Sequence, residues 1–147
     1  FFAEGTRCTA IEHRLNMMMD APDMLALCDE LDLASINRIP LAMGMLSGRW
    51  TRETQLPADD WRGAFFKVDQ FVQDLEKVQA LRQVLTRDGR SYVQAALGWI
   101  WARCPRTVPV PGFRTLAHVE EDAAAMAFGP LGDAQMRAVD KVLGRTS

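Results

Sequence analysis

The sequence predicts an α/β fold made of parallel βαβ units. Short apolar segments rich in β-branched residues alternate with longer segments whose apolar residues recur every three or four positions. This alternation is typical of a parallel sheet with crossover helices. The predicted order is strand, helix, strand, long loop, two helices, strand, helix, helix, which gives too few strands to close a sheet. A chain of 147 residues is one domain's worth, so we treat residues 1–147 as a single segment.

The composition narrows the class of partner and compartment. The chain is 48% hydrophobic and 24% charged with a net charge of −2, which argues against nucleic acid or an anionic membrane as the main partner. Its three cysteines are odd in number and widely spaced, so buried thiols in a reducing compartment are expected and a metal site is not. With no membrane-length apolar run and no signal-peptide pattern, a cytoplasmic location is predicted. Because the chain begins at Phe1 with no initiator methionine, we expect it to be a fragment or a chain whose leader is missing.

The first two predicted strands are Cys8–Ile11 and Leu33–Ile39. Phe1–Gly5, ahead of them, is typical of the end of a helix. A helix opens between the strands, with Pro22 at an early position. Ligand contacts in α/β folds gather at the carboxyl ends of strands, and polar residues follow the first strand here: Glu12, His13, Arg14 and Asn16.

A glycine-containing loop and a long excursion follow the second strand. Leu41–Arg49 carries Gly44 and Gly48 but lacks the phosphate-binding fingerprints of P-loops and dinucleotide folds. Trp50–Lys67 is predicted as an irregular excursion with a short helix around Ala58–Arg62. Loops of this length in a compact domain are usually functional or lid-like.

The remaining helices and the third strand have clear boundaries. Asp69–Arg87 is an amphipathic helix, and Ser91 with the glutamine three residues later predicts a capping box for the next one. Thr107–Val110 is predicted as a buried strand and Leu116–Met126 as the helix behind it. The last helix is Asp133–Leu143, with its first residue as the predicted N-cap.

The turn after the third predicted strand carries an anion-site pattern. Gly112 allows a close approach of the backbone to a ligand. Thr115 can cap the following helix, and Arg114 precedes that cap. A guanidinium beside the free N–H groups of a helix N-terminus binds anions. The alternative is an ordinary strand-to-helix turn with a surface arginine.

Three segments together resemble the aldo/keto reductases, a family of NADP(H)-dependent (β/α)8 barrels. Ile11-Glu-His-Arg-Leu-Asn16 resembles the family's sixth strand, and Ile39–Arg49 the Ser-Pro-Leu-x-x-Gly-x-Leu-Thr/Ser-Gly-Lys segment after the seventh. Val110-Pro-Gly-Phe-Arg-Thr, continuing to Asp122, is similar to the eighth-strand motif. The resemblance implies a partial TIM barrel, its last three βα units (strands 6–8) plus extra helices, completed by oligomerisation or by a partner. The partner would be a second copy or a separate N-terminal barrel half.

The resemblance also implies how the cofactor NADP(H) is held. The sixth-strand positions that hold the nicotinamide amide fall on Glu12 and Asn16, and the residue that stacks on the nicotinamide ring falls on Arg38. The loop along the pyrophosphate would comprise Pro40, Leu41, Gly44, Leu46, Ser47, Gly48 and Arg49. The adenosine 2′-phosphate would be held by Gly112, Phe113, Arg114 and Thr115. The adenine would be surrounded by His118, Glu121 and Asp122.

Departures from the family pattern affect the predicted activity. Glu12 places a carboxylate where the family has an amide, Ile39 replaces a serine, and Asp122 replaces an asparagine. The family's Asp, Tyr, Lys and His tetrad lies on its first four strands, and neither Tyr92 nor either histidine of this chain matches it. General acid chemistry needs a placed proton donor, so no catalytic residue is predicted.

The predicted function is therefore a segment of an NADP(H)-linked oxidoreductase whose parent reaction is carbonyl reduction by hydride transfer, with the isolated chain inactive. The alternative is a non-catalytic oligomeric remnant that acts as a binding or interaction module. If three strands stand alone, two of them are sheet edges, and inward-facing side chains, predicted to include Ile11, Ile36 and Val110, are left in water. A simple monomer is not expected.

Overall fold

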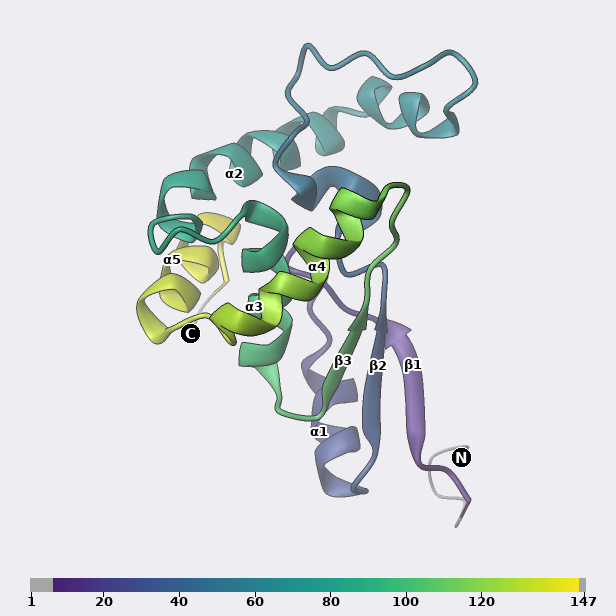
Figure 1. The fold of residues 1–147 in the computed structure, drawn as a ribbon, viewed down its shortest axis with the longest axis vertical. Coiled ribbons are helices and arrows are strands. Elements are labelled where there is room, and N and C mark those ends of the chain that lie inside the picture. The colour runs from purple at the N-terminus through teal and green to yellow at the C-terminus, as the bar shows by residue number, and fades with distance from the viewer. Residues whose placement is uncertain (1–6, 146–147) are drawn as a thin grey trace.

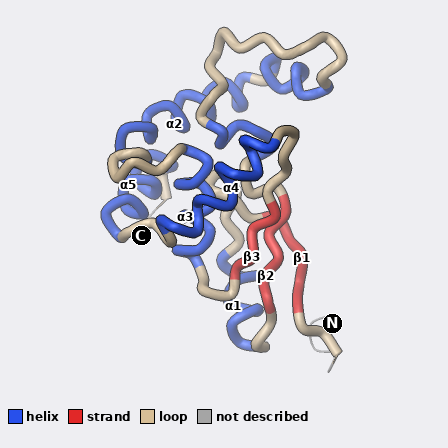
Figure 2. Tube along the Cα trace, viewed as in Figure 1, coloured by secondary structure: helices blue, strands red, loops and turns tan. Residues whose placement is uncertain are grey.

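The computed structural model describes residues 7–145, in which a three-stranded sheet lies against a group of helices (Figure 1, Figure 2). The predicted helix end at Phe1–Gly5 lies outside the described residues. The helices and strands, in chain order, are β1 (Ala10–Arg14), α1 (Pro22–Glu30), β2 (Ala34–Arg38), the 3-10 helices η1 (Ala42–Ser47) and η2 (Trp61–Lys67), α2 (Asp69–Leu85), α3 (Tyr92–Arg103), β3 (Thr107–Val110), α4 (Leu116–Phe128) and α5 (Asp133–Leu143).

The sheet has the order β1-β2-β3 with both pairs parallel, as the alternation of strands and helices predicts. The predicted first strand Cys8–Ile11 is displaced, because parallel pairing continues through the polar residues to Arg14, opposite Arg38. Glu12, His13 and Arg14, which the sequence places after the strand, therefore belong to it, whereas Asn16 lies beyond its end. The short helix predicted around Ala58–Arg62 is also displaced, because the 3-10 helix η2 begins at Trp61.

The two faces of the sheet differ in what covers them. Ser35 and Asn37 are fully buried on the face that the helices cover. On the other face, Val110 lies beside Arg38 and is 54% exposed. Ile36 shares this open face because it pairs with Glu12 and Val108. The prediction for Ile11 is wrong: its partner is Ser35, so by the alternation of side chains along a strand it points to the helix side.

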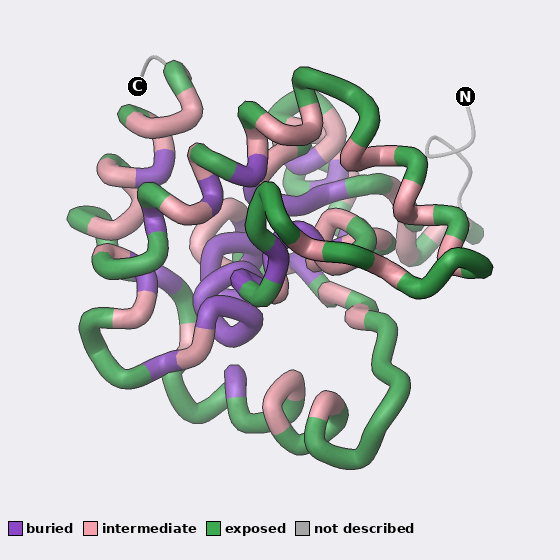
Figure 3. The backbone as a smooth tube through the Cα atoms, turned by 90° about the horizontal axis from the view of Figure 1, so that it is seen from above, coloured by how far each residue is buried: buried purple, intermediate pink, exposed green. Residues whose placement is uncertain are grey.

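The hydrophobic core lies among helices α2, α3 and α5, with further side chains from α1, η1 and the loop after β1. Helix α3 is buried along most of its length, and buried segments gather in the middle of the molecule (Figure 3). Trp99 is fully buried in this core. Burying a large apolar side chain stabilises the fold by roughly 1.5–3 kcal/mol. The fully buried apolar side chains include Leu15, Met17, Leu46, Val78, Leu81, Leu85, Ile100 and Val139.

Two of three predicted helix caps are confirmed. The Ser91 hydroxyl accepts from the backbone N–H of Gln94 at 3.2 Å, and the Gln94 side chain accepts from the Ser91 N–H at 2.8 Å. The Thr115 hydroxyl accepts from the His118 N–H. The prediction for Asp133 is wrong, because Gly132 is the N-cap of α5 and its N–H is satisfied by Gln135 instead.

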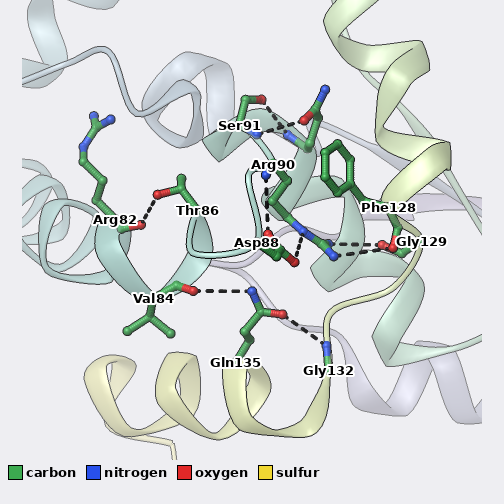
Figure 4. A network of polar contacts seen from close by, with 11 residues as sticks. Arg82, Val84, Thr86, Asp88, Arg90, Ser91, Phe128, Gly129, Gly132 and Gln135 are labelled. Carbon is green, nitrogen blue, oxygen red and sulfur yellow. Dashed lines mark hydrogen bonds and ion pairs between the residues drawn. The ribbon is translucent and has the colours of Figure 1, made fainter.

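A polar network built on Arg90 fixes α4 against α3 (Figure 4). Arg90 is 6% exposed and pairs with Asp88 at 2.9 Å. Its guanidinium donates to the carbonyls of Phe128 and Gly129 at the C-terminus of α4. Gln94 adds a bond from α3 to the backbone carbonyl of Glu121, in the middle of α4. The helix that carries the predicted adenine residues is therefore held at its C-terminus and at its middle.

The three cysteines are free thiols, with Cys28 and Cys104 buried and Cys8 half-buried. Within residues 7–145, no group of side chains is suited to hold a metal ion. No helix in this part of the chain has the length and apolar character needed to cross a membrane.

Candidate functional site

One cavity of about 550 Å³ gathers most of the predicted binding residues. It lies between the loop after β2, the excursion that carries η2, the loop after β3 and the first turns of α4. This volume is within the roughly 300–1,000 Å³ of small-molecule and cofactor sites. The predicted site residues that line it are Pro40, Leu41, Gly44, Ser47, Arg49, Gly112, Phe113, Arg114, His118, Glu121 and Asp122.

The loop after β2 is tightly folded around its glycines. Gly44 has a φ of +110°, and a Cβ there would lie 2.9 Å from the ring of Trp50. Gly48 has a φ of +68°, and a Cβ there would lie 2.8 Å from Tyr92. Any larger residue at either position would be strained and would clash. Gly48 and the fully buried Leu46 do not line the cavity and support its wall from behind.

A charged contact joins this loop to α4 across the floor of the cavity. The Arg49 guanidinium lies 2.9 Å from the Glu121 carboxylate and 3.0 Å from Nε2 of His118. Nδ1 of His118 accepts from the Arg114 backbone N–H at 3.3 Å. These contacts order three of the predicted residues relative to one another, although they are 69 and 72 positions apart in sequence.

Arg114 differs from Arg49 in its surroundings: its charge helps to lower the pKa of Asp60, but the two side chains form no ion pair. Among residues 7–145, no carboxylate forms an ion pair with Arg114, whose side chain is exposed at the cavity. Thr115 lies behind it as the N-cap of α4, a helix of 13 residues, and does not itself line the cavity. A cation beside a helix N-terminus is an arrangement that favours an anion.

Asp122 supplies an unsatisfied acceptor. Its Oδ2 atom is buried without a hydrogen-bond partner among the described residues. Burial raises the pKa of the Asp122 carboxyl, and the negative charge of Glu121 raises it further. A buried oxygen without a partner is costly, so a ligand that donates a hydrogen bond here would be favoured.

The three residues predicted at the nicotinamide do not line this cavity. Glu12 and Arg38 form a long ion pair of 3.8 Å on the open face of the sheet. Asn16 is 4% exposed, and its side chain bonds the carbonyl of Ile39 and the N–H groups of Met18 and Met19. These three positions are outside the lining of the cavity but border it, because Asn16 bonds Ile39 and Arg38 pairs with Val110, and both of those partners line it.

Several residues that line the cavity were not among the predicted binding residues. The most prominent are Trp61 and Arg62 from η2, and the others are Ile39, Met43, Trp50, Val93 and Val110. The Arg62 guanidinium pairs with Asp60, whose pKa it lowers to about 2, and lies 5.3 Å from the Trp50 ring centre. The only available signal was the length of the excursion that contains Trp61 and Arg62.

Tyr92 and His13 do not lie where a proton donor for chemistry in the cavity would be needed. The hydroxyl of Tyr92, the chain's single tyrosine, donates to the Val78 carbonyl at 2.8 Å, and burial raises its pKa far above the ordinary value. His13 lies on β1, where burial lowers its pKa and Nε2 is 2.7 Å from the Ser35 hydroxyl. Neither group lines the cavity.

Comparisons with known proteins agree on one family. The model of the aldo/keto reductase family matches residues 3–143. Pyridoxal reductase, chloroplastic, of Arabidopsis thaliana is 31% identical over 124 residues, which are 84% of this chain and 32% of that protein. An aldo-keto reductase of Schizosaccharomyces pombe, named with NADP(+), is 25% identical over 114 residues, covering 76% of this chain and 33% of its own.

The fold also matches a solved structure. A glycerol dehydrogenase from Gluconobacter oxydans superposes with a TM-score of 0.79 at 24% identity, over 92% of this chain and 42% of that one. The chain spans about a third of the length of the curated relatives it matches.

Proposed function

This chain belongs to the aldo/keto reductase family, and we propose that it supplies the adenosine-binding part of an NADP(H)-dependent oxidoreductase whose reaction is carbonyl reduction. The single observation that carries the proposal is the cavity in which Arg114, His118, Glu121 and Asp122 meet the loop after β2.

The residues present fit such a cofactor. The 2′-phosphate matches Arg114, which has no ion-pair partner within residues 7–145, and the N-terminus of α4 behind it. The exocyclic amino group of adenine is a hydrogen-bond donor and matches the unpartnered Oδ2 of Asp122. The glycine-bearing loop, with Ser47 and Arg49, would follow the pyrophosphate.

When bound, the cofactor supplies the hydride for carbonyl reduction. The role of this chain is to bind and orient the cofactor. Arg114 would hold its 2′-phosphate, Arg49 orders Glu121 and His118, and η2 would exclude water from one side of the cavity. Protonation of the product oxygen requires a donor that we do not assign to this chain. We propose that the donor comes from an N-terminal barrel half, and that the remaining strands come from that half or from a second copy.

The open face and edges of the sheet support this partial-barrel proposal. Val108 and Val110 are about half exposed on that face, and β1 and β3 each pair with only one neighbour among the described strands. Covering them with further strands, from an N-terminal half or from a second copy, would remove both edges. We also propose that residues 1–147 form one segment. We place it in the cytoplasm because its three cysteines are free thiols, as is usual in a reducing compartment.

A second candidate is a binding module without catalysis. The observation in its favour is that Glu12, Asn16 and Arg38 contact other groups of the chain and lie outside the cavity. Such a module would bind the adenosine part of the cofactor without ordering its nicotinamide.

The test is an isothermal titration calorimetry experiment in which the purified chain is titrated separately with NADPH, NADH and adenosine 2′,5′-bisphosphate. Binding of both 2′-phosphorylated ligands with NADH at least tenfold weaker would support the proposal, and absence of binding by all three would refute it. Binding of NADPH and the bisphosphate with equal affinity would favour the second candidate. A parallel assay of NADPH oxidation with aldehydes and quinones is expected to match the protein-free control.

A further inference from the structure

Exposed apolar side chains gather at the mouth of the cavity. Of the large apolar residues that are most exposed, four line it: Met43 at 43%, Trp61 at 66%, Val110 at 54% and Phe113 at 65%. Exposed apolar surface concentrated at a concave site marks ligand binding. Trp61 has the largest side chain of the four and is the only one contributed by η2.

The indole of Trp61 has room for a ligand. Its one aromatic contact is a T-shaped arrangement with Phe65, at 5.4 Å between ring centres and 79° between planes. An edge-to-face contact of this kind covers at most one face of the indole. The other face is available to a planar group, and aromatic rings bind such groups by stacking whichever base is present.

The neighbouring residue fixes where Trp61 lies. The Arg62 guanidinium is held by both carboxylate oxygens of Asp60, by the Met43 carbonyl at 3.3 Å and by the ring of Trp50. Trp50 in turn packs on Phe66. These contacts attach η2 to the loop after β2, which forms the opposite side of the cavity.

We propose that Trp61 is a binding residue that stacks its indole on a planar ring of the nucleotide, and that Arg62 is a positioning residue that acts through Trp61. The inference deepens the proposed function and rests on it. Its consequence is that the Trp50–Lys67 excursion carries ligand affinity of its own, in addition to the phosphate contacts made from α4.

The first experiment compares Trp61→Ala and Trp61→Phe with the unchanged chain by calorimetric titration with NADPH. Stacking on one aromatic ring contributes enough that its loss should weaken binding about tenfold, and phenylalanine should restore most of it. Met126→Ala is the matched control, because Met126 is 78% exposed on α4 but does not line the cavity. Thermal unfolding midpoints within about two degrees of that of the unchanged chain would establish that all variants are folded.

The ring is identified by repeating the titration with adenosine 2′,5′-bisphosphate and with reduced nicotinamide mononucleotide. A loss confined to the bisphosphate assigns the adenine, and a loss confined to the mononucleotide assigns the nicotinamide. If Trp61→Ala binds NADPH as the unchanged chain does, the stacking proposal is overturned and the proposed function stands. If the unchanged chain binds no nucleotide, both are overturned.

The positioning role is tested by placing Arg62→Ala in the unchanged chain and in the Trp61→Ala chain. If Arg62 acts through Trp61, the Arg62→Ala substitution weakens NADPH binding in the unchanged chain and has no effect in the Trp61→Ala chain. Equal losses in both backgrounds would show that Arg62 contacts the ligand directly, and would overturn this part of the proposal.

Discussion

The Arg49 guanidinium lies 2.9 Å from the carboxylate of Glu121 and ties the loop after β2 to the first turns of α4. The contact neutralises one of the cations at the cavity. Arg49 is 57% exposed at its side chain, so the pair is screened by water and salt. It is therefore weak enough for an anionic ligand to compete with it.

Replacing Glu121 with glutamine should strengthen phosphate binding. The variant keeps a hydrogen-bond acceptor for Arg49 but leaves its charge free, and an exposed pair of this kind is worth about 1 kcal/mol or less. NADPH affinity is expected to rise by up to about fivefold, with a steeper dependence on salt. Calorimetric titration at two salt concentrations measures both. Glu120→Gln, on the exposed side of the same helix, is the control, and a weaker affinity in the Glu121 variant would contradict this assignment.

Arg114→Ala should abolish most of the preference for NADPH over NADH. Loss of a hydrogen bond to a charged group costs roughly 1.5–3 kcal/mol of binding free energy. The loss applies only to NADPH, because NADH has no 2′-phosphate. Fluorescence titration of both cofactors against both proteins gives the preference directly. Arg52→Ala, an exposed arginine of the excursion that does not line the cavity, should keep it. Equal affinities of the unchanged chain for the two cofactors would show that Arg114 is not a 2′-phosphate ligand.

Arg90→Met should destabilise the fold and not merely the site. The substitution removes the guanidinium that satisfies two carbonyls at the end of α4, and we expect a loss of roughly 1.5–3 kcal/mol in the free energy of unfolding. Urea denaturation measures it. Arg87→Met, an exposed residue on the same turn, should leave the midpoint unchanged, and a similar loss in both variants would point to the turn instead of the network.

Stability should fall as the pH drops below the ordinary histidine pKa of 6.5. Burial lowers the pKa of His13 in the folded chain, so in this range the unfolded chain binds more protons and folding opposes protonation. The contribution is complete above pH 6.5 and is lost progressively below it. Replacing His13 with glutamine should flatten the pH dependence of the urea midpoint between pH 5 and 7, about the range in which histidine titrates. An unchanged slope in the variant would assign the pH dependence to other groups.

The isolated chain should form oligomers at micromolar concentration. Val108 and Val110 leave apolar surface on the open face, and β1 and β3 present edges that favour pairing with another chain. Light scattering should give a mass above that of the 16.5 kDa monomer. Adding lysine in place of Val108 should shift the mass toward the monomer, while the same change at the exposed Val119 of α4 should not. A monomer that unfolds cooperatively would refute this prediction.

The sequence alone determined the order of the elements, the bounds of β3 and α5, and the caps at Ser91 and Thr115. Each of these depends on residues a few positions apart, whose spacing sets the local backbone. The glycine-bearing loop and the turn before α4 could also be assigned to one site, because family resemblance relates segments that are distant in the chain.

Only the tertiary structure decided which distant side chains meet. Three contacts join residues from separate elements: Arg49 pairs with Glu121, Arg62 lies over the ring of Trp50, and Arg90 caps the C-terminus of α4. The face on which Ile11 lies was decided in the same way, since it depends on the register between β1 and β2. These features follow from long-range packing, and a one-residue change of strand register moves every side chain to the opposite face without changing the local sequence pattern.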